Sequence, residues 1–219
     1  MIPKIIYMCH KDLYYIEKYS KNWTKLNPKY KIELYDDALC KKFLLNEFSE
    51  THSQIFDFIP DGPIKADFWR CCILYKKGGV YIDADIEPLI PLRDYIADHV
   101  NFVTCISSNF NNMQFGTKTY NMNPHFIMAE KGEKLLEKCI SKYLFFYKAK
   151  IKYDYWKWSI CNFFPVIQEI TKKKSQIIDI NSRKFQFILE KDNQEECEFN
   201  GKIVFNNRYK NYKNHNFSH

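Results

Sequence analysis

The sequence predicts an α/β fold, with a mostly parallel, Rossmann-like central sheet and helices on both of its faces. Strand and helix patterns alternate through the first half of the chain, which is typical of parallel sheets. The chain has 219 residues, enough for one sizeable α/β domain. A hydrophobic content of 46% and an aromatic content of 17% exclude a disordered chain. Because such sheets bind ligands beyond the carboxyl ends of their strands, we expect the functional residues there.

Hydrophobic periodicity places the elements before residue 60. Apolar residues recur at helical spacing in some segments and alternate with polar residues in others. We expect strands at 2–8 and 31–35, and helices at 13–26, 38–48 and 49–59. Asp37 is the expected N-cap of the second of these helices, since a short acidic side chain can accept from free backbone N–H groups.

The most informative stretch runs from residue 61 to residue 92. Asp61 and Pro63 suit the start of a helix, because Asp can cap and Pro lacks an N–H that would bond nothing there. Gly78 suits its end, where a positive φ favours glycine. Residues 80–86 then alternate with period two, which predicts a strand.

Five side chains whose functional groups could bind a ligand or take part in a reaction lie in this stretch. Tyr81, Asp83 and Asp85 share one face of the expected strand, and Asp67 and Arg70 share a face of the helix before it. Neighbouring carboxylates repel each other unless a cation lies beside them. Oxygen ligands without a nearby His or Cys suit a hard ion, so we expect Mn²⁺ or Mg²⁺.

The second half of the chain is less regular. We expect strands at 100–106, 125–129, 176–180, 185–189 and 202–205, and an amphipathic helix at 130–148. The polar loop at 107–123 has a length that is typical of functional loops. Gln114, Asn121, Asn123 and His125 are candidates for ligand contact, and for each of them a surface turn residue is the alternative.

Cysteines and charge narrow the class of protein. The eight cysteines form no C-x-x-C pair, which favours reduced, buried thiols over a disulfide framework or a zinc site. The net charge of +7 is spread over scattered lysines. No basic helix carries interleaved base-reading residues, so we expect no nucleic-acid partner. Peripheral contact with an anionic membrane stays an alternative.

The N-terminus and the apolar runs bear on location. The start of the chain lacks a basic region followed by a long apolar one, so we expect no signal peptide. The apolar runs are too short for a membrane span. The expected location is therefore the cytosol of a bacterium or of a host cell. The sequence indicates no particular oligomeric state.

The stretch A-D-F-W-R, followed by L-Y and G-G-V-Y-I-D-A-D, resembles the signature of the DxD-containing sugar transferases. That family includes yeast-type initiating mannosyltransferases, bacterial capsular polysaccharide transferases and glucosylating clostridial toxins. A D-x-D alone would be weak evidence, whereas the whole string with its spacing is specific. Ala66 stands where the family usually has Ser.

The resemblance implies a GT-A fold and a single catalytic domain spanning 1–219. Residues 1–92 would form the half that binds the nucleotide sugar and the metal, and 93–219 the acceptor-side half. Asp85 would be the direct metal ligand, and Asp83 would assist the metal and contact ribose or sugar hydroxyls. Asp67 and Arg70 would hold the donor sugar and its phosphate side, and Tyr81 would support the same face of the substrate.

Both ends of the chain add residues by resemblance. The opening I-P-K-I-I-Y is similar to the strand that lies beside the nucleotide base in the family, so Tyr7 or His10 would stack on the base. The alternative is that both are half-buried residues at a strand end. Near the C-terminus, His215 would reach the metal and Ser218 the diphosphate, with a flexible tail as the alternative.

The expected activity is metal-dependent transfer of a sugar from a UDP- or GDP-linked donor to a hydroxyl on a glycan or protein acceptor, with retention of anomeric configuration. One alternative is a D-x-D phosphohydrolase, which would use the first Asp as nucleophile. Against it, Ile86-Glu87-Pro88 follows the motif where those enzymes have Thr or Val and then Gly. The other alternative is a non-catalytic relative that binds a nucleotide or glycan.

Overall fold

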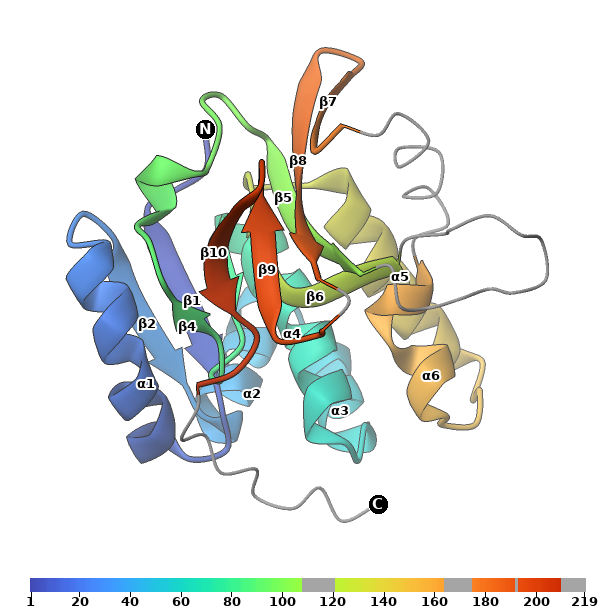
Figure 1. The fold of residues 1–219 in the computed structure, drawn as a ribbon. Helices are drawn as coiled ribbons and strands as arrows, with labels where there is room; N and C mark the ends of the chain where they lie inside the picture. Colours follow the sequence, from blue (N-terminus) through green and yellow to red (C-terminus); the bar gives the residue numbers. More distant parts are fainter. Residues whose placement is uncertain (108–120, 164–174, 192, 210–219) are drawn as a thin grey trace.

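The structure is a computed structural model of the chain, and it describes residues 1–107, 121–163, 175–191 and 193–209 (Figure 1). One sheet of ten strands runs through these residues. Its strand order is β2-β1-β3-β6-β5-β8-β9-β10-β4, and β7 pairs with β8 beside this path. The prediction of an α/β fold with a central sheet flanked by helices is confirmed.

The first half alternates strands and helices as expected. Its elements are β1 (Ile5–Cys9), α1 (Leu13–Leu26), β2 (Lys31–Tyr35), α2 (Asp37–Glu47), α3 (Glu50–Phe58), α4 (Gly62–Lys77) and β3 (Gly79–Ile82). The N-cap of α2 is Asp36, whose side chain accepts from the Leu39 N–H at 2.7 Å, so the assignment of Asp37 as the cap was wrong by one residue.

The second half contains short elements that the sequence did not predict. It runs through β4 (Glu87–Pro88), the 3-10 helix η1 (Leu92–Asp94), β5 (Phe102–Ser107), β6 (Asn121–Ala129), α5 (Lys134–Lys148), α6 (Tyr155–Trp158), η2 (Ile160–Phe163), β7 (Ile177–Ile180), β8 (Arg183–Glu190), β9 (Glu196–Phe199) and β10 (Lys202–Asn206). Strands β4 and β9 and helix α6 were missed. Each has four residues or fewer, too few for a periodic pattern to show.

Strand directions divide the sheet into two parts. β2, β1 and β3 are parallel neighbours, and β5 and β8 are parallel to each other. β6 lies between β3 and β5 and runs antiparallel to both, so β5 and β8 point the same way as the first three strands. β9, β10 and β4 continue the sheet with antiparallel pairings. The parallel part brings the carboxyl ends of β2, β1 and β3 to one edge.

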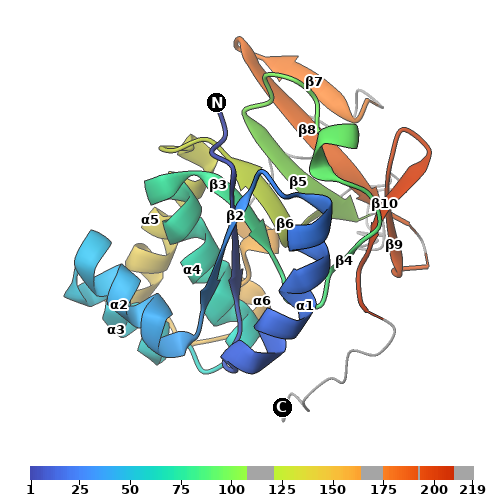
Figure 2. The same ribbon diagram turned by 90° about the vertical axis from the view of Figure 1, so that its left-hand side faces the viewer.

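Two apolar cores lie on opposite faces of the sheet (Figure 2). Helices α2 to α5 cover one face, where Phe68 and Tyr143 pack with ring centroids 5.0 Å apart. Helix α1 covers part of the other face, where Trp23 packs near Phe126 at 6.4 Å. In the described part of the chain, no helix is both long and apolar enough to cross a membrane.

The junction between α4 and β3 is tightly constrained. Gly78 ends α4 with a φ of 66°, as predicted, and its N–H donates to the Leu74 carbonyl at 2.7 Å. A Cβ added at Gly78 would meet the Lys131 nitrogen at 2.7 Å. β3 then ends at Ile82, so the predicted strand through residue 86 is too long. Residues 83–86 form a turn instead, closed by the Ile86 N–H donating to the Asp83 carbonyl at 3.2 Å.

Strand β6 carries a large bulge against β5. Thr104 on β5 pairs with Ile127 on β6, but the next residue, Cys105, pairs with Asn123. The β6 residues between Asn123 and Ile127 therefore have no partner on β5. The residues left over include His125, whose carbonyl accepts from the Asp83 N–H at 2.8 Å. Bulges of this kind redirect side chains near functional sites. Here the bulge fixes the backbone at the start of the D-x-D turn.

Candidate functional site: an aspartate pair at the end of strand β3

The D-x-D turn lies beyond the carboxyl end of β3, where the fold class predicts ligand binding. Ala84 and Ile86 are buried in the apolar core, so the alternation of inward and outward side chains continues past the end of the strand. The side chains of Asp83 and Asp85 are 31% and 26% exposed. Both carboxylates are therefore accessible from solvent, while the residues between and after them anchor the turn.

Asp83 is held from one side. Its Oδ1 accepts from the Tyr81 hydroxyl at 2.7 Å and lies 3.1 Å from an Arg70 terminal nitrogen. The guanidinium of Arg70 also lies over the Tyr81 ring, 4.3 Å from its centroid. Since both contacts fall on Oδ1, the second oxygen of Asp83 has no hydrogen-bond donor among the described residues. One oxygen fixes the carboxylate and the other is available to a ligand.

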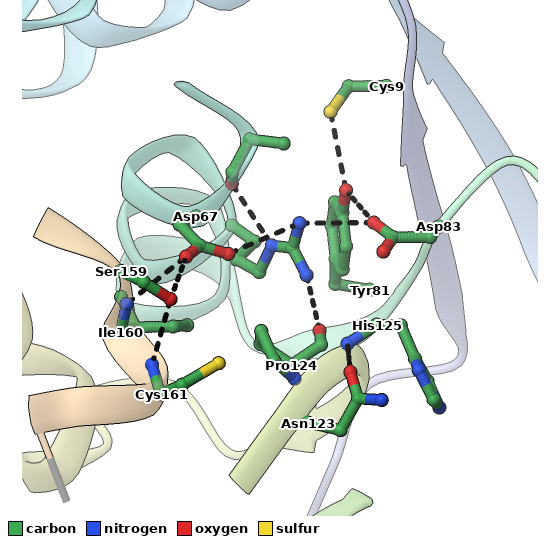
Figure 3. Close-up of polar contacts among 12 residues, drawn as sticks. Cys9, Asp67, Tyr81, Asp83, Asn123, Pro124, His125, Ser159, Ile160 and Cys161 are labelled. Carbon is green, nitrogen blue, oxygen red and sulfur yellow. Dashed lines mark hydrogen bonds and ion pairs between the residues drawn. The ribbon is translucent and has the colours of Figure 1, made fainter. Parts of the chain in front are cut away.

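Asp67 and Arg70 form a buried chain that ends on Asp83 (Figure 3). Asp67 Oδ1 lies 3.4 Å from Arg70, and its Oδ2 accepts from the Ile160 N–H at 3.1 Å and the Ser159 hydroxyl at 3.3 Å. Arg70 also donates to the carbonyls of Ala66 and Pro124. Both side chains are almost fully buried. In this structure they position Asp83, and their direct contact with a donor sugar stays a prediction.

The electrostatics of the turn favour a bound cation. Burial raises the pKa of Asp83, and Arg70 only partly offsets the effect. Burial, followed by the nearby charge of Asp83, raises the pKa of Asp85 to about 7. Burial also raises the pKa of Asp67 to about 6. Two acids that resist losing their protons together would ionise readily beside a divalent ion. The oxygen donors of Asp83 and Asp85 fit Mn²⁺ or Mg²⁺.

Arg208 and Tyr209, just after β10, complete the turn from the far end of the described chain. Arg208 Nε lies 3.9 Å from Asp85 Oδ2, and the Tyr209 N–H donates to the Asp85 carbonyl at 2.9 Å. The Tyr209 hydroxyl donates to the Tyr19 carbonyl at 2.8 Å. Sequence reasoning missed both residues, because neither belongs to a motif and their proximity depends on the β8–β10 strands folding back.

The predicted base-stacking residues separate in the structure. Tyr7 is fully buried, and its ring packs closely against Gly79. A Cβ added at Gly79 would lie only 2.9 Å from that ring. A nucleotide base cannot reach this ring, so its assignment as a base-stacking residue is corrected to a core role. His10 follows β1 at the functional edge, is partly exposed, and has its Nδ1 3.0 Å from the Asp12 N–H. It stays the candidate for the base.

Other predicted site residues have mixed outcomes. Tyr81 is fully buried and its hydroxyl donates to Asp83, so it positions that carboxylate, and its support of the substrate face stays a prediction. Gln114, His215 and Ser218 lie outside the described residues. Asn123 donates to Glu190 at 3.3 Å, and His125 is buried, so neither is a surface turn residue.

Comparison with known proteins points to the same residues. A family model described as "Glycosyltransferase sugar-binding region containing DXD motif" matches residues 14–103. The match includes α1 from its second residue and the whole of α4 and β3, together with the D-x-D turn. The residues from 104 onward, including Arg208 and Tyr209, lie outside it.

Several curated proteins are similar over less than half of this chain. The initiation-specific alpha-1,6-mannosyltransferase of Schizosaccharomyces pombe is 34% identical over 101 residues, which cover 43% of this chain and 26% of that enzyme. The inositol phosphoceramide mannosyltransferase 3 of the same yeast is 34% identical over 102 residues, 44% of this chain and 28% of the relative. An uncharacterised glycosyltransferase of Acanthamoeba polyphaga mimivirus is 33% identical over 101 residues, 44% of this chain and 40% of the relative.

A solved structure shares the fold. The glycosyltransferase PaToxG superposes with a TM-score of 0.50 and 16% sequence identity, covering 69% of this chain and 63% of that one. The likeness confirms the GT-A fold that the resemblance implied. The family model also matches the segment that contains Asp83 and Asp85, and its description, like the names of the relatives, refers to glycosyltransferases. Over residues 14–103, this chain is therefore similar to glycosyltransferase sugar-binding regions that contain a DXD motif.

Proposed function

We propose that this protein transfers a sugar from a nucleoside diphosphate sugar to a hydroxyl of a glycan or protein acceptor. The observation that carries the proposal is the buried chain Asp67–Arg70–Asp83, which presents one free carboxylate oxygen beside Asp85. These three residues lie inside the region that matches the glycosyltransferase family model. The relatives are far longer than the matched segments, so donor and acceptor are part of the proposal.

Asp85, assisted by Asp83, would hold Mn²⁺ or Mg²⁺. When bound, such an ion supplies a Lewis acid that stabilises the departing diphosphate. The protein's own residues set this up in advance. Arg70 and the Tyr81 hydroxyl fix Asp83 Oδ1, so the carboxylate needs no reorganisation when the donor arrives. In this proposal His10, which follows the carboxyl end of β1, contacts the nucleotide base.

Arg208 is a further candidate for the diphosphate. Its side chain is 57% exposed and lies at the edge of ion-pair distance from Asp85. An exposed guanidinium beside the metal ligand suits recognition of phosphate oxygens. We propose that it leaves Asp85 for the diphosphate when the donor binds.

The two halves of the chain would divide the work. In this proposal residues 1–92 bind the nucleotide sugar and the metal, and residues 93–219 face the acceptor. Retention of anomeric configuration, a front-face route and roles for His215 and Ser218 rest on the family resemblance alone. Two relatives are named for mannosyl transfer, so mannose is the first sugar to test.

The phosphohydrolase alternative is less well supported. Its first aspartate must attack a phosphate, and the residues that follow the motif here, Ile86-Glu87-Pro88, are not those of such enzymes. The buried Asp67–Arg70 pair also has no role in that chemistry. A non-catalytic binding relative would keep the fold and the turn but show no turnover.

The decisive experiment combines binding with turnover. Thermal unfolding is measured with UDP or GDP, with and without Mn²⁺, and hydrolysis is screened over UDP- and GDP-linked sugars, mannose included. We expect metal-dependent stabilisation by one nucleotide and slow hydrolysis of its sugar. Turnover of a simple phosphate ester without a nucleotide effect would favour the hydrolase, and binding without turnover the inactive relative.

Asp85→Ala tests the metal assignment. We expect a folded protein whose activity falls to background, since removal of the direct ligand abolishes metal-dependent stabilisation of the leaving group. The matched control is Asp94→Ala, which removes a partly exposed carboxylate in η1 away from the turn. Full activity in Asp85→Ala would refute the assignment.

A further inference from the structure

Three metal-binding side chains meet in the core behind the D-x-D turn. They are Cys105 on β5, His125 on β6 and Cys197 on β9. Their ligand atoms all lie within 4.8 Å of one another, and all three residues are buried. None of them has a role in the proposed sugar transfer. The sequence pattern favoured isolated reduced thiols, because residues so far apart in the chain form no recognisable metal motif.

The fold brings these residues together through specific features. The bulge in β6 leaves His125 without a register partner on β5, next to Cys105. Cys105 pairs with Ile188 on β8, and Cys197 pairs with Glu190 two positions further along the same strand. Since side chains two apart on a strand share a face, Cys105 and Cys197 lie on the same side of the sheet.

The spacing suits a tetrahedral ion with sulfur and nitrogen ligands. Zinc binds sulfur at about 2.3 Å and imidazole nitrogen at about 2.0 Å, which separates neighbouring ligand atoms by roughly 3.5 to 3.8 Å in a tetrahedron. Cys197 Sγ lies 3.8 Å from His125 Nε2. This pair matches the expected ligand spacing, and the other ligand atoms lie within 4.8 Å, close enough for side-chain adjustment to complete the geometry.

We propose that Cys105, His125 and Cys197 hold a structural zinc ion, or a divalent ion of similar softness. Binding would release the two thiol protons, and two thiolates with a neutral imidazole balance the charge of the ion. In this proposal Asn207 is the candidate for the fourth ligand. Its Oδ1 accepts the Cys197 thiol proton at 2.9 Å, and loss of that proton leaves the oxygen free.

A carboxylate supports the fourth ligand from outside. Asn207 Nδ2 donates to Glu190, which is buried and also accepts from Asn123 Nδ2 at 3.3 Å. Among the described residues, Glu190 forms no ion pair with a Lys or an Arg. A buried carboxylate held only by amides is stabilised by a cation nearby, and such outer partners orient metal ligands.

This ion would be separate from the one at the D-x-D turn. The turn offers carboxylate oxygens to a hard ion, whereas the cluster offers sulfur and nitrogen. The two are linked through His125, whose carbonyl accepts from the Asp83 N–H at 2.8 Å. A metal on the His125 ring would therefore stiffen the backbone that positions Asp83.

The test measures metal content and ligand type in the full chain. Protein made in zinc-supplemented medium and dialysed against buffer without metal is analysed by elemental mass spectrometry. We expect about one zinc ion per chain, as in other structural zinc sites. Protein refolded with Co²⁺ should show the intense visible bands of a tetrahedral ion and a thiolate charge-transfer band. The cobalt spectrum uses the unaltered protein, so it does not depend on a variant folding.

Variants assign the ion to the cluster. Cys105→Ala and Cys197→Ala should lose the zinc and unfold at lower temperature, whereas Cys139→Ala, also a buried cysteine but outside the cluster, should keep it. Asp85→Ala should keep it too, which separates this site from the proposed catalytic metal. Unaltered protein without zinc and without the cobalt spectrum would overturn the proposal. So would a disulfide between Cys105 and Cys197 detected by mass spectrometry.

Discussion

Arg70 contacts two carboxylates and an aromatic face at once. Its guanidinium lies 3.4 Å from Asp67, 3.1 Å from Asp83 and 4.3 Å from the centroid of Tyr81. The fixed fork of a guanidinium suits such a branched contact, and the single ammonium of Lys does not. The motif spacing predicted that Arg70 belongs to the site. It did not predict that the side chain would be buried, because burial depends on how β6 and η2 pack over α4.

The hydroxyl of Tyr81 is the most direct test of how Asp83 is held. Tyr81→Phe removes its 2.7 Å hydrogen bond to Asp83 and keeps the ring. A hydrogen bond to a charged group contributes about 1.5–3 kcal/mol, so kcat/KM should fall by roughly 10- to 100-fold. The measurement is steady-state kinetics at saturating Mn²⁺ with the donor identified by the hydrolysis screen.

Tyr7→Phe is the matched control for that variant. The Tyr7 hydroxyl is buried and has no hydrogen-bond partner among the described residues. Its removal should leave the kinetics unchanged and leave stability equal or slightly higher, since a buried unpaired hydroxyl is unfavourable. Weaker nucleotide binding in Tyr7→Phe would instead restore the base-contact role that the burial of Tyr7 argues against.

The buried carboxyl of Asp67 should make stability depend on pH. Its pKa is raised from 3.8 to about 6 in the folded protein, first of all by burial. Between these values the folded protein binds a proton that the unfolded chain does not, so Asp67 lowers the free energy of unfolding as the pH rises through this window. Above pH 6 the loss is complete and amounts to at most about 3 kcal/mol.

Asp67→Asn should remove this effect. The amide keeps an oxygen to accept from the Ile160 N–H, so the variant should be more stable than the unaltered protein at pH 7.5. The difference should disappear near pH 4. Chemical denaturation of both proteins at several pH values, without added metal or nucleotide, measures it. An equal or larger loss of stability at pH 7.5 would mean that the Asp67–Arg70 ion pair outweighs the cost of burying the charge.

At the scale of elements, the boundaries of α4 and β3 show what local sequence can and cannot predict. Gly78 at the end of α4 was predictable, because a positive φ there favours glycine. The end of β3 was not, since alternation of buried and exposed residues continues to Ile86 although strand pairing stops at Ile82. The bulge in β6 was also hidden, because it depends on pairing with β5 and β3 together.

Three glycine-to-alanine substitutions, one of them at this junction, should separate the cost of a positive φ from the cost of steric contact. Gly62→Ala lies in α4, where a Cβ meets nothing within 4 Å, and should be neutral or stabilising. Gly132→Ala also meets open space but has a φ of +77°, so it should cost about 1–2 kcal/mol. Gly78→Ala adds contacts of 2.7 and 2.9 Å to a positive φ and should cost more than Gly132→Ala.

Thermal and urea unfolding of the three variants give the order directly. The expected ranking of stability is Gly62→Ala, then Gly132→Ala, then Gly78→Ala. If Gly78→Ala and Gly132→Ala were equally stable, the close packing of α4 and β3 against Pro3 and Lys131 would contribute nothing.

At the scale of the whole molecule, the site joins segments from both ends of the described chain. The first half supplies α4, β3 and the D-x-D turn. They follow one another directly in the sequence, so the spacing of their residues was enough to predict that they form one site. Arg208 and Tyr209 reach the turn only because β10 pairs with β4, which directly follows it. Sequence alone could not predict this pairing, since β4 has two residues and carries no pattern.

Arg208 should compete with a bound metal ion for Asp85. Without a donor, Arg208 partly offsets the charge of Asp85 across 3.9 Å. With a donor, the same guanidinium is free to contact the diphosphate. Arg208→Ala should therefore bind Mn²⁺ alone at least as tightly as the unaltered protein, while it binds the nucleoside diphosphate more weakly by roughly tenfold, as expected for the loss of one charged contact.

Titration calorimetry with Mn²⁺, and then with nucleotide in the presence of Mn²⁺, measures the two effects separately. Arg93→Ala, which removes an exposed arginine beside Asp94, is the control and should change neither. Because the effect on the nucleotide is electrostatic and near the surface, it should shrink as salt is raised. If Arg208→Ala instead weakened Mn²⁺ binding and left nucleotide binding unchanged, Arg208 would serve to orient Asp85 and would have no part in binding the diphosphate.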